Sequence, residues 1–133
     1  MLKYRLTGYI NNYGQLTEEA DSCLAISERK DFYNGGDNLI FAEFFEENLE
    51  NKQVSISYFI AEEETPREEL EEQYLKKITG LVRASIYPVY SDVTGYLWTN
   101  EKCKVGGHDL YEELQSYEGK YIDMAIEVLE KED

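Results

Sequence analysis

ENKQVSISYFI at residues 50–60 and EGKYIDMAIEV at residues 118–128 are the two stretches that decide the fold. In each, a Lys and a residue that tolerates a left-handed backbone, Asn51 or Gly119, precede apolar residues that alternate with mostly polar ones. Alternation with a period of two predicts a half-buried strand, and Asn or Gly at that point ends a preceding helix. Each stretch therefore predicts a helix–turn–strand unit. Two explanations stay open, an internal duplication and convergence, since any helix–strand connection favours these residues.

Helices are predicted before both strands and in a third place. Residues 39–49 carry large apolar side chains at helical spacing, and Asp109 with Glu112 three positions later marks the start of a second helix that Gly119 ends. Residues 65–80 combine a capping box, Thr65 with Glu68, with a proline at the first helical position. One stripe at i, i+4 and i+8, together with Gly80 as the stop, completes a predicted third helix: Leu70, Tyr74 and Ile78.

The remaining segments predict strands and turns. Strands are expected at residues 2–7, 23–27, 84–90 and 96–98, a turn at 11–14 and a polar loop at 100–107. Pro88 lacks a ladder donor, so its strand is expected at an edge or with a bulge. The sequence thus predicts an α+β fold with a mostly antiparallel sheet of five to six strands and two or three helices. We expect a single domain over residues 1–133, with the acidic tail 129–133 a candidate for disorder.

Charge is the unusual feature of the composition. The 133 residues include 28 acids and 13 Lys or Arg, which gives a net charge of −15. The acids fall in two blocks: residues 37–73 hold twelve acids and two bases, and residues 109–133 hold nine acids and two bases. Residues 74–108 are mildly basic, with two acids and five bases. Solvated helix faces account for such blocks, and so does a surface that meets a basic partner.

The composition excludes several classes of protein and bounds the location. A net charge of −15 excludes a protein that grips duplex nucleic acid through a general basic face, and it argues against an anionic membrane as the partner. No apolar run approaches the roughly 20 residues of a membrane helix, and no secretory leader is evident. Two cysteines make no disulfide framework. We therefore expect a cytoplasmic protein.

The acidic blocks supply the candidate partner-binding residues. Regularly placed carboxylates on a rigid scaffold can stand in for phosphates, and aromatic side chains with a polar tip are frequent in interfaces. One exposed helix face and the segment that follows the central strand provide the carboxylates, and three residues of the basic segment border them. The predicted partner-binding residues are Glu43, Glu46, Glu47, Glu50, Glu62, Glu63, Glu64, Glu68, Glu69, Tyr96, Trp98 and His108.

His108 is the single histidine and carries the alternative hypothesis. It follows a Gly pair and precedes Asp109, and Cys103 lies five residues upstream, so a small enzyme or ligand-binding site near Cys103, His108 and Asp109 is conceivable. The bland interpretation is a turn followed by a helix cap, with His108 on the surface. Cys and His spacing does not favour a metal, no glycine-rich phosphate loop occurs, and we expect neither cofactor nor metal.

The last third of the chain resembles small uncharacterised proteins of phages and prophages. The residues that carry the resemblance are YSDVTGYLW (90–98), VGGHDL (105–110) and EGKY (118–121). The resemblance implies a mobile-element origin and assigns no catalytic residue. With the charge, it leads to the hypothesis of a non-enzymatic inhibitor that docks as a nucleic-acid mimic on a basic, nucleic-acid-binding host protein. A phage structural or assembly protein that forms homo-oligomers through a Tyr-rich sheet edge is a second alternative.

Overall fold

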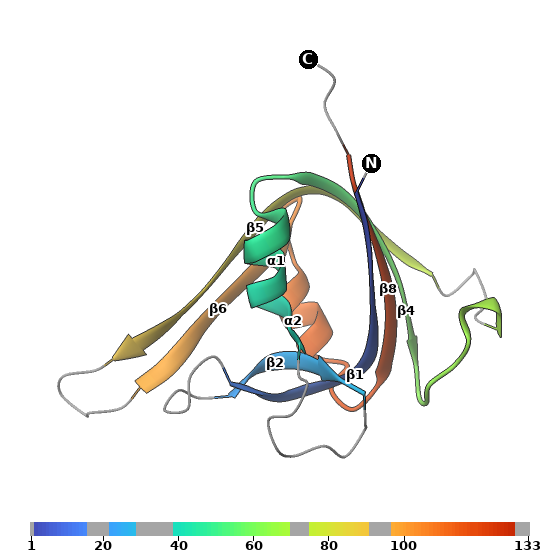
Figure 1. Ribbon diagram of the computed structural model, residues 1–133, viewed down its shortest axis with the longest axis horizontal. Helices are drawn as coiled ribbons and strands as arrows, with labels where there is room; N and C mark the ends of the chain where they lie inside the picture. The colour runs from blue at the N-terminus through green and yellow to red at the C-terminus, as the bar shows by residue number, and fades with distance from the viewer. Residues whose placement is uncertain (1, 16–21, 29–38, 70–74, 91–96, 130–133) are drawn as a thin grey trace.

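An antiparallel sheet curls around two short helices in the computed structural model (Figure 1). The structure describes residues 2–15, 22–28, 39–69, 75–90 and 97–129. Within them the sheet has eight strands in the order β3-β2-β1-β8-β4-β5-β6-β7. Their bounds are β1 (Lys3–Gln15), β2 (Ser22–Ser27), β3 (Leu39–Ile40), β4 (Gln53–Ala61), β5 (Lys76–Tyr90), β6 (Leu97–Val105), β7 (His108–Asp109) and β8 (Tyr121–Val128).

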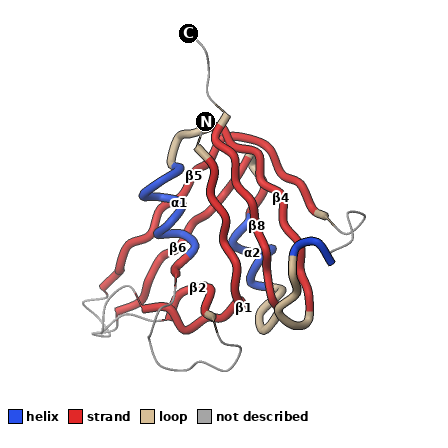
Figure 2. Tube along the Cα trace, turned by 45° about the vertical axis from the view of Figure 1, so that its right-hand side comes forward, coloured by secondary structure: helices blue, strands red, loops and turns tan. Residues whose placement is uncertain are grey.

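The helices α1 (Phe41–Leu49) and α2 (Leu110–Gln115) lie on the concave face of this sheet (Figures 1 and 2). The alternation in β4 and β8 turns one apolar set inward, where it packs with the apolar faces of both helices. The core therefore lies between the helices and the central strands. Its largest fully buried side chains include Phe41, Phe45, Leu49, Ile56, Tyr58, Leu110, Leu114, Ile122, Met124 and Ile126.

Several predicted elements are confirmed. Both helix–turn–strand units form, with Asn51 and Gly119 at φ values of 66° and 87° between helix and strand. Residues 3–7 and 23–27 are strands that pair with the same sheet. Pro88 lies opposite Thr99 of β6, while β4 pairs with β5 only as far as Leu81, so the missing donor falls on an open strand side.

The predicted helix over residues 65–80 is wrong. Residues 67–69 form a single turn of 3₁₀-helix, η1 (Arg67–Glu69), and residues 76–80 belong to β5, where Ile78 pairs with Ile56. Leu70 and Tyr74 lie outside the described residues. One helical turn forms after the predicted cap, and in it the NH of Glu69 donates to the carbonyl of Pro66. From residue 76 onward, pairing with β4 and β6 overrides helix propensity, because β5 bonds to a neighbouring strand along its whole length.

Two further predictions need correction. The predicted turn at residues 11–14 lies within β1, where the register against β2 shifts between Asn11 and Gly14. The extra residue is accommodated as a bulge, so the turn-forming residues bend the strand without ending it. The predicted polar loop at 100–107 is mostly β6, and only Gly106 and Gly107 turn. The two-residue strands β3 and β7 bring the strand number above the predicted five to six, and two α-helices are present in the described chain.

The two halves of the described chain have the same topology. The first half runs β1-β2-β3-α1-β4, and the second half runs β5-β6-β7-α2-β8. The sheet order keeps this relation, because exchanging each strand with its counterpart in the other half reverses the order and leaves it unchanged. The central pair β4–β8 is antiparallel and is centred on Ser57 opposite Ala125, which are equivalent positions of the two halves. The sheet therefore has an internal pseudo-two-fold axis at that pair.

Hydrogen bonds repeat at equivalent positions of the halves. The NH of Asn51 donates to the carbonyl of Val82 at 3.0 Å, and the NH of Gly119 donates to that of Ile10 at 2.8 Å. In return the NH of Val82 donates to the carbonyl of Lys52, and the NH of Ile10 donates to that of Lys120, both at 2.9 Å. The internal similarity read from the two stretches thus extends to the strands around them.

Two further predictions concern the acidic tail and a membrane-spanning helix. The NH of Leu129 donates to the carbonyl of Gln53 at 2.8 Å, so the first residue of the acidic tail is held on the sheet. Residues 130–133 lie outside the described part. Neither helix of the described chain has the length and apolar character needed to cross a bilayer.

Candidate functional site

One carboxylate of α1 and the one that follows its last residue complete the edge of a strand. Beyond Leu81, β5 has no strand partner on the side of β4 among the described residues. Glu46 Oε2 accepts a hydrogen bond from the NH of Ile86 at 3.1 Å, and Glu50 Oε2 accepts one from the NH of Ala84. Glu50 also lies 3.8 Å from the Arg83 guanidinium. These carboxylates replace a missing strand, because a buried backbone NH needs an acceptor.

The segment after β4 presents five exposed carboxylates of the predicted set. Glu62, Glu63, Glu64, Glu68 and Glu69 are all exposed, and the side chain of Glu62 is 77% accessible. Tyr9 fastens this acidic segment (residues 62–69) to the convex face: its hydroxyl accepts from the NH of Glu64 at 2.9 Å and donates to Glu63 at 3.3 Å. Lys120 pairs with Glu62. The acidic segment is therefore attached to the sheet at both of these points.

Beside the acidic segment lies a hollow on the convex face. Arg5 pairs with the fully buried Asp123 through two hydrogen bonds, of 2.7 and 3.2 Å, and these contacts raise the pKa of Arg5. The hollow has a volume of about 580 Å³ and is lined by Arg5, Thr7, Glu64, Thr65, Pro66 and Tyr121. Because Asp123 already compensates the charge of Arg5, the pair serves mainly to hold β1 against β8.

The other predicted site residues are dispersed. Glu43 is half-buried and Glu47 is exposed, both on α1. Trp98 lies in β6 opposite Val89, and Tyr96 lies outside the described residues. His108 stands on β7, at the open end of the concave face. The structure thus groups the acidic segment and separates it from His108.

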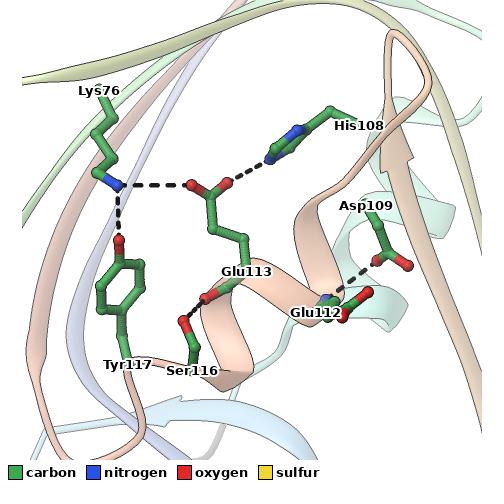
Figure 3. A network of polar contacts seen from close by, with 7 residues as sticks. All are labelled: Lys76, His108, Asp109, Glu112, Glu113, Ser116 and Tyr117. Carbon is green, nitrogen blue, oxygen red and sulfur yellow. Dashed lines mark hydrogen bonds and ion pairs between the residues drawn. The ribbon is translucent and has the colours of Figure 1, made fainter.

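A polar cluster surrounds His108. Its Nε2 lies 2.5 Å from Glu113 Oε2 of α2, and the Nζ of Lys76 lies 3.7 Å from Glu113 Oε1 (Figure 3). The same Nζ donates to the hydroxyl of Tyr117 at 2.6 Å. Asp109 caps α2 by accepting from the NH of Glu112 at 3.1 Å, as the sequence predicts. Lys76 and His108 thus converge on one carboxylate.

Tyr58 of β4 completes this group, which we call the α2 cluster: Tyr58, Lys76, His108, Glu113 and Tyr117. Tyr58 is fully buried, and its hydroxyl lies near the Glu113 carboxylate without a hydrogen bond of normal geometry in the described structure. Tyr58, Lys76, His108 and Glu113 border an open surface cavity of about 480 Å³ that Lys77, Ile78, Thr79, Val105 and Gly106 also line.

The pKa shifts in the α2 cluster reflect this geometry. Burial opposes the charge of Glu113, but the neighbouring His108, Tyr58 and Lys76 outweigh it and lower the pKa of the carboxyl. Burial, followed by the nearby carboxylate of Glu113, raises the pKa of Tyr58. The hydrogen bond to Tyr117 raises the pKa of Lys76. Glu113 is therefore an anion, and Tyr58 and Lys76 keep their protons, at neutral pH.

The cysteines do not support nucleophilic chemistry. Cys103 is 2% exposed within the core, and burial raises the pKa of its thiol above the ordinary range. A thiolate is the reactive form, so a Cys103–His108 nucleophile pair lacks its nucleophile at neutral pH. No group of three or more metal-ligating side chains occurs in the part of the chain that the structure describes.

Most of the α2 cluster could not be predicted from the sequence. His108 stands out as the one histidine. The sequence pattern indicates only that Tyr58 lies on the inward face of a strand, and it places Lys76 near the end of a predicted helix. No local pattern links residues of β4, β5, β7 and α2, because strand pairing brings them together.

Comparison of the chain with protein-family models, with curated proteins and with solved structures finds no match.

Proposed function

We propose that this protein is a non-enzymatic acidic binding protein that docks on the basic surface of a nucleic-acid-binding protein and blocks it as a nucleic-acid mimic. The observation that carries the proposal is the acidic segment, with its five exposed glutamates between Glu62 and Glu69. The contacts of Tyr9 and Lys120 support it, because attachment lowers the entropy lost when the carboxylates meet a partner.

The charge of the whole molecule supports the same proposal. A net charge of −15 produces a long-range field that speeds the approach of a basic partner. Glu46 and Glu50 contribute to this field, but their hydrogen bonds to β5 keep them from serving as direct contacts. Glu62 and Glu63 attach the acidic segment to the sheet, so the proposed docking residues are Glu64, Glu68 and Glu69, with Glu47 of α1 at a separate exposed position.

Matched charge variants test this proposal. The variant Glu64→Gln, Glu68→Gln, Glu69→Gln removes three charges from the acidic segment, and Glu28→Gln, Glu47→Gln, Glu112→Gln removes three from exposed positions elsewhere. Proteins captured on the immobilised protein from nuclease-treated lysate are compared at low and physiological salt, with duplex DNA as competitor. We expect the first variant to lose a DNA-competed partner that the second retains.

The salt dependence of partner binding can contradict the proposal. Electrostatic docking weakens strongly between low and physiological ionic strength, because the Debye length shortens to roughly 8 Å. Binding that is insensitive to salt, or that both variants lose equally, would exclude the acidic segment as the docking surface. A captured partner that keeps its nucleic-acid binding in the complex would exclude mimicry.

A further inference from the structure

We infer that the α2 cluster is a binding site for a small oxyanion ligand, one that carries a carboxylate or phosphate group. This site is independent of the proposed docking surface, since the α2 cluster faces the concave side and the acidic segment is attached to Tyr9 on the convex side. Three observations carry the inference: a comparison of the two halves, a buried hydroxyl without a partner among the described residues, and a surplus of hydrogen-bond donors.

The pseudo-two-fold relation provides an internal comparison. Lys76 lies opposite Tyr58 in the β5–β4 ladder, and at the place related by the pseudo-two-fold axis Tyr4 lies opposite Ile126 in the β1–β8 ladder. Tyr4 contacts Phe44 of α1 with ring centroids 5.3 Å apart, where Lys76 contacts Glu113 of α2.

The rest of the cluster follows the same correspondence. His108, the first residue of β7, corresponds to Leu39, the first residue of β3. Tyr117 corresponds to Leu49, because each carbonyl accepts from the Lys that precedes the next strand. The counterparts of the α2 cluster are thus aromatic or aliphatic: Tyr4, Leu39, Phe44, Leu49 and Ile126. The fold fills one of the two equivalent corners, between β1, β8 and α1, with largely apolar groups, so the polar groups at the other corner, between β5, β4 and α2, serve something besides the fold.

The hydroxyl of Tyr58 has a cost that a ligand would remove. It is fully buried, lines the cavity and makes no hydrogen bond within the described chain, whereas Ile126 at its equivalent position places no polar atom there. A buried polar atom without a partner opposes folding. An acceptor oxygen in the cavity would satisfy the Tyr58 hydroxyl, which keeps its proton at neutral pH.

The remaining groups select an anion. Both oxygens of Glu113 are engaged, by His108 and by Lys76. The ammonium of Lys76 has three donors, and Tyr117 and Glu113 account for two of them. Its side chain is 48% accessible and that of His108 is 49%, so a ligand can reach both. The cavity therefore offers unused donors and compensated negative charge, which match the acceptor oxygens of an oxyanion.

Titration of the full chain with three probes tests the inference. Benzoate and inorganic phosphate are added to ¹⁵N-labelled protein, with neutral benzamide as control, while amide shifts are followed by NMR. We expect saturable shifts at Thr79, Gly106 and Glu113 with an oxyanion and none with benzamide. A response to benzoate alone identifies a carboxylate site, and one to phosphate alone a phosphate site. Absence of saturation by either anion, or equal shifts with benzamide, overturns the inference.

Variants separate a binding role from a structural one. Tyr58→Phe removes only the hydroxyl, so we expect about 5–10-fold weaker oxyanion binding with an unchanged or raised melting temperature. Glu113→Gln removes the negative charge and should bind the anion more tightly. Lys102→Met, at an exposed position of β6, is the charge-matched control for Lys76→Met and should retain the affinity that Lys76→Met loses. Unchanged affinity in both Tyr58→Phe and Lys76→Met would contradict the inference.

Discussion

At the scale of single residues, the nearby backbone of Gly106 requires a glycine at position 80. A Cβ at Gly80 would lie 2.3 Å from the Cα of Gly106, a backbone atom that cannot move aside. Gly107 has open space around it, but its φ of 83° strains any other residue. Gly80 therefore allows two backbone segments to approach closely, whereas Gly107 allows a left-handed turn.

We expect Gly80→Ala to destabilise the protein more than Gly107→Ala. The strain at Gly107 amounts to about 1–2 kcal/mol, and the clash at Gly80 adds overpacking of about 1–3 kcal/mol to the cost of its own backbone geometry. Urea unfolding of both variants measures the difference. Equal losses would show that β5 moves away from the Gly106 turn at little cost.

At the scale of elements, Glu101 joins two strands that are distant in the sheet order. Its Oε1 accepts a hydrogen bond from the NH of Leu24 at 3.0 Å, which links β6 to β2 across the concave face. Burial raises the pKa of Glu101, against the opposing effects of the Leu24 NH and the Tyr111 hydroxyl. The carboxylate thus satisfies an open strand edge, but its charge is disfavoured there.

Two substitutions of Glu101 should act in opposite directions at neutral pH. Glu101→Ala leaves the Leu24 NH without its acceptor and should lower the free energy of unfolding by about 1–3 kcal/mol. Glu101→Gln keeps an acceptor oxygen without the buried charge and should raise it.

The pH dependence gives the sign of that second effect. A raised pKa in the folded state means that the wild type loses stability as pH rises from the ordinary carboxyl value through the folded value. The advantage of Glu101→Gln should therefore be absent at about pH 3, below the ordinary carboxyl pKa, and present at neutral pH. Denaturant unfolding across this range measures it, and an advantage that grows toward acid would contradict the assignment.

Sequence patterns predicted elements well where local and long-range preferences agree. The strands at 53–61 and 121–128 and their preceding helices combine alternation, apolar faces and left-handed turns, all of which the fold uses. The helix prediction failed at residues 76–80 because Ile78 fits a helical stripe as well as a strand, and pairing with β4 decided between them. The sequence likewise predicts Glu46 and Glu50 on the surface, but their carboxylates accept hydrogen bonds from NH groups at the edge of β5.

At the scale of the whole molecule, the pseudo-two-fold relation separates what the fold needs from what it carries. Equivalent backbone hydrogen bonds recur in both halves, so they belong to the fold. The α2 cluster and its apolar counterparts differ although they occupy equivalent places, so their chemistry is free to vary. Local sequence could not reveal this, because each place is assembled from residues of four separate elements.

Replacing the central polar trio with its counterparts tests this separation. In Tyr58→Ile, Lys76→Tyr, Glu113→Phe the polar corner between β4, β5 and α2 receives the side chains that the equivalent corner between β8, β1 and α1 has at Ile126, Tyr4 and Phe44. We expect the fold to persist with a melting temperature at or above that of the wild type, because a buried unpaired hydroxyl and a partly buried carboxylate are replaced by apolar contacts. The reverse exchange, Ile126→Tyr, Tyr4→Lys, Phe44→Glu, is the control and should destabilise, since Leu39 and Leu49 provide no polar partners there. Thermal unfolding followed by circular dichroism measures both variants. Loss of folding in the first variant, with survival of the second, would mean that the polar trio holds β4, β5 and α2 together.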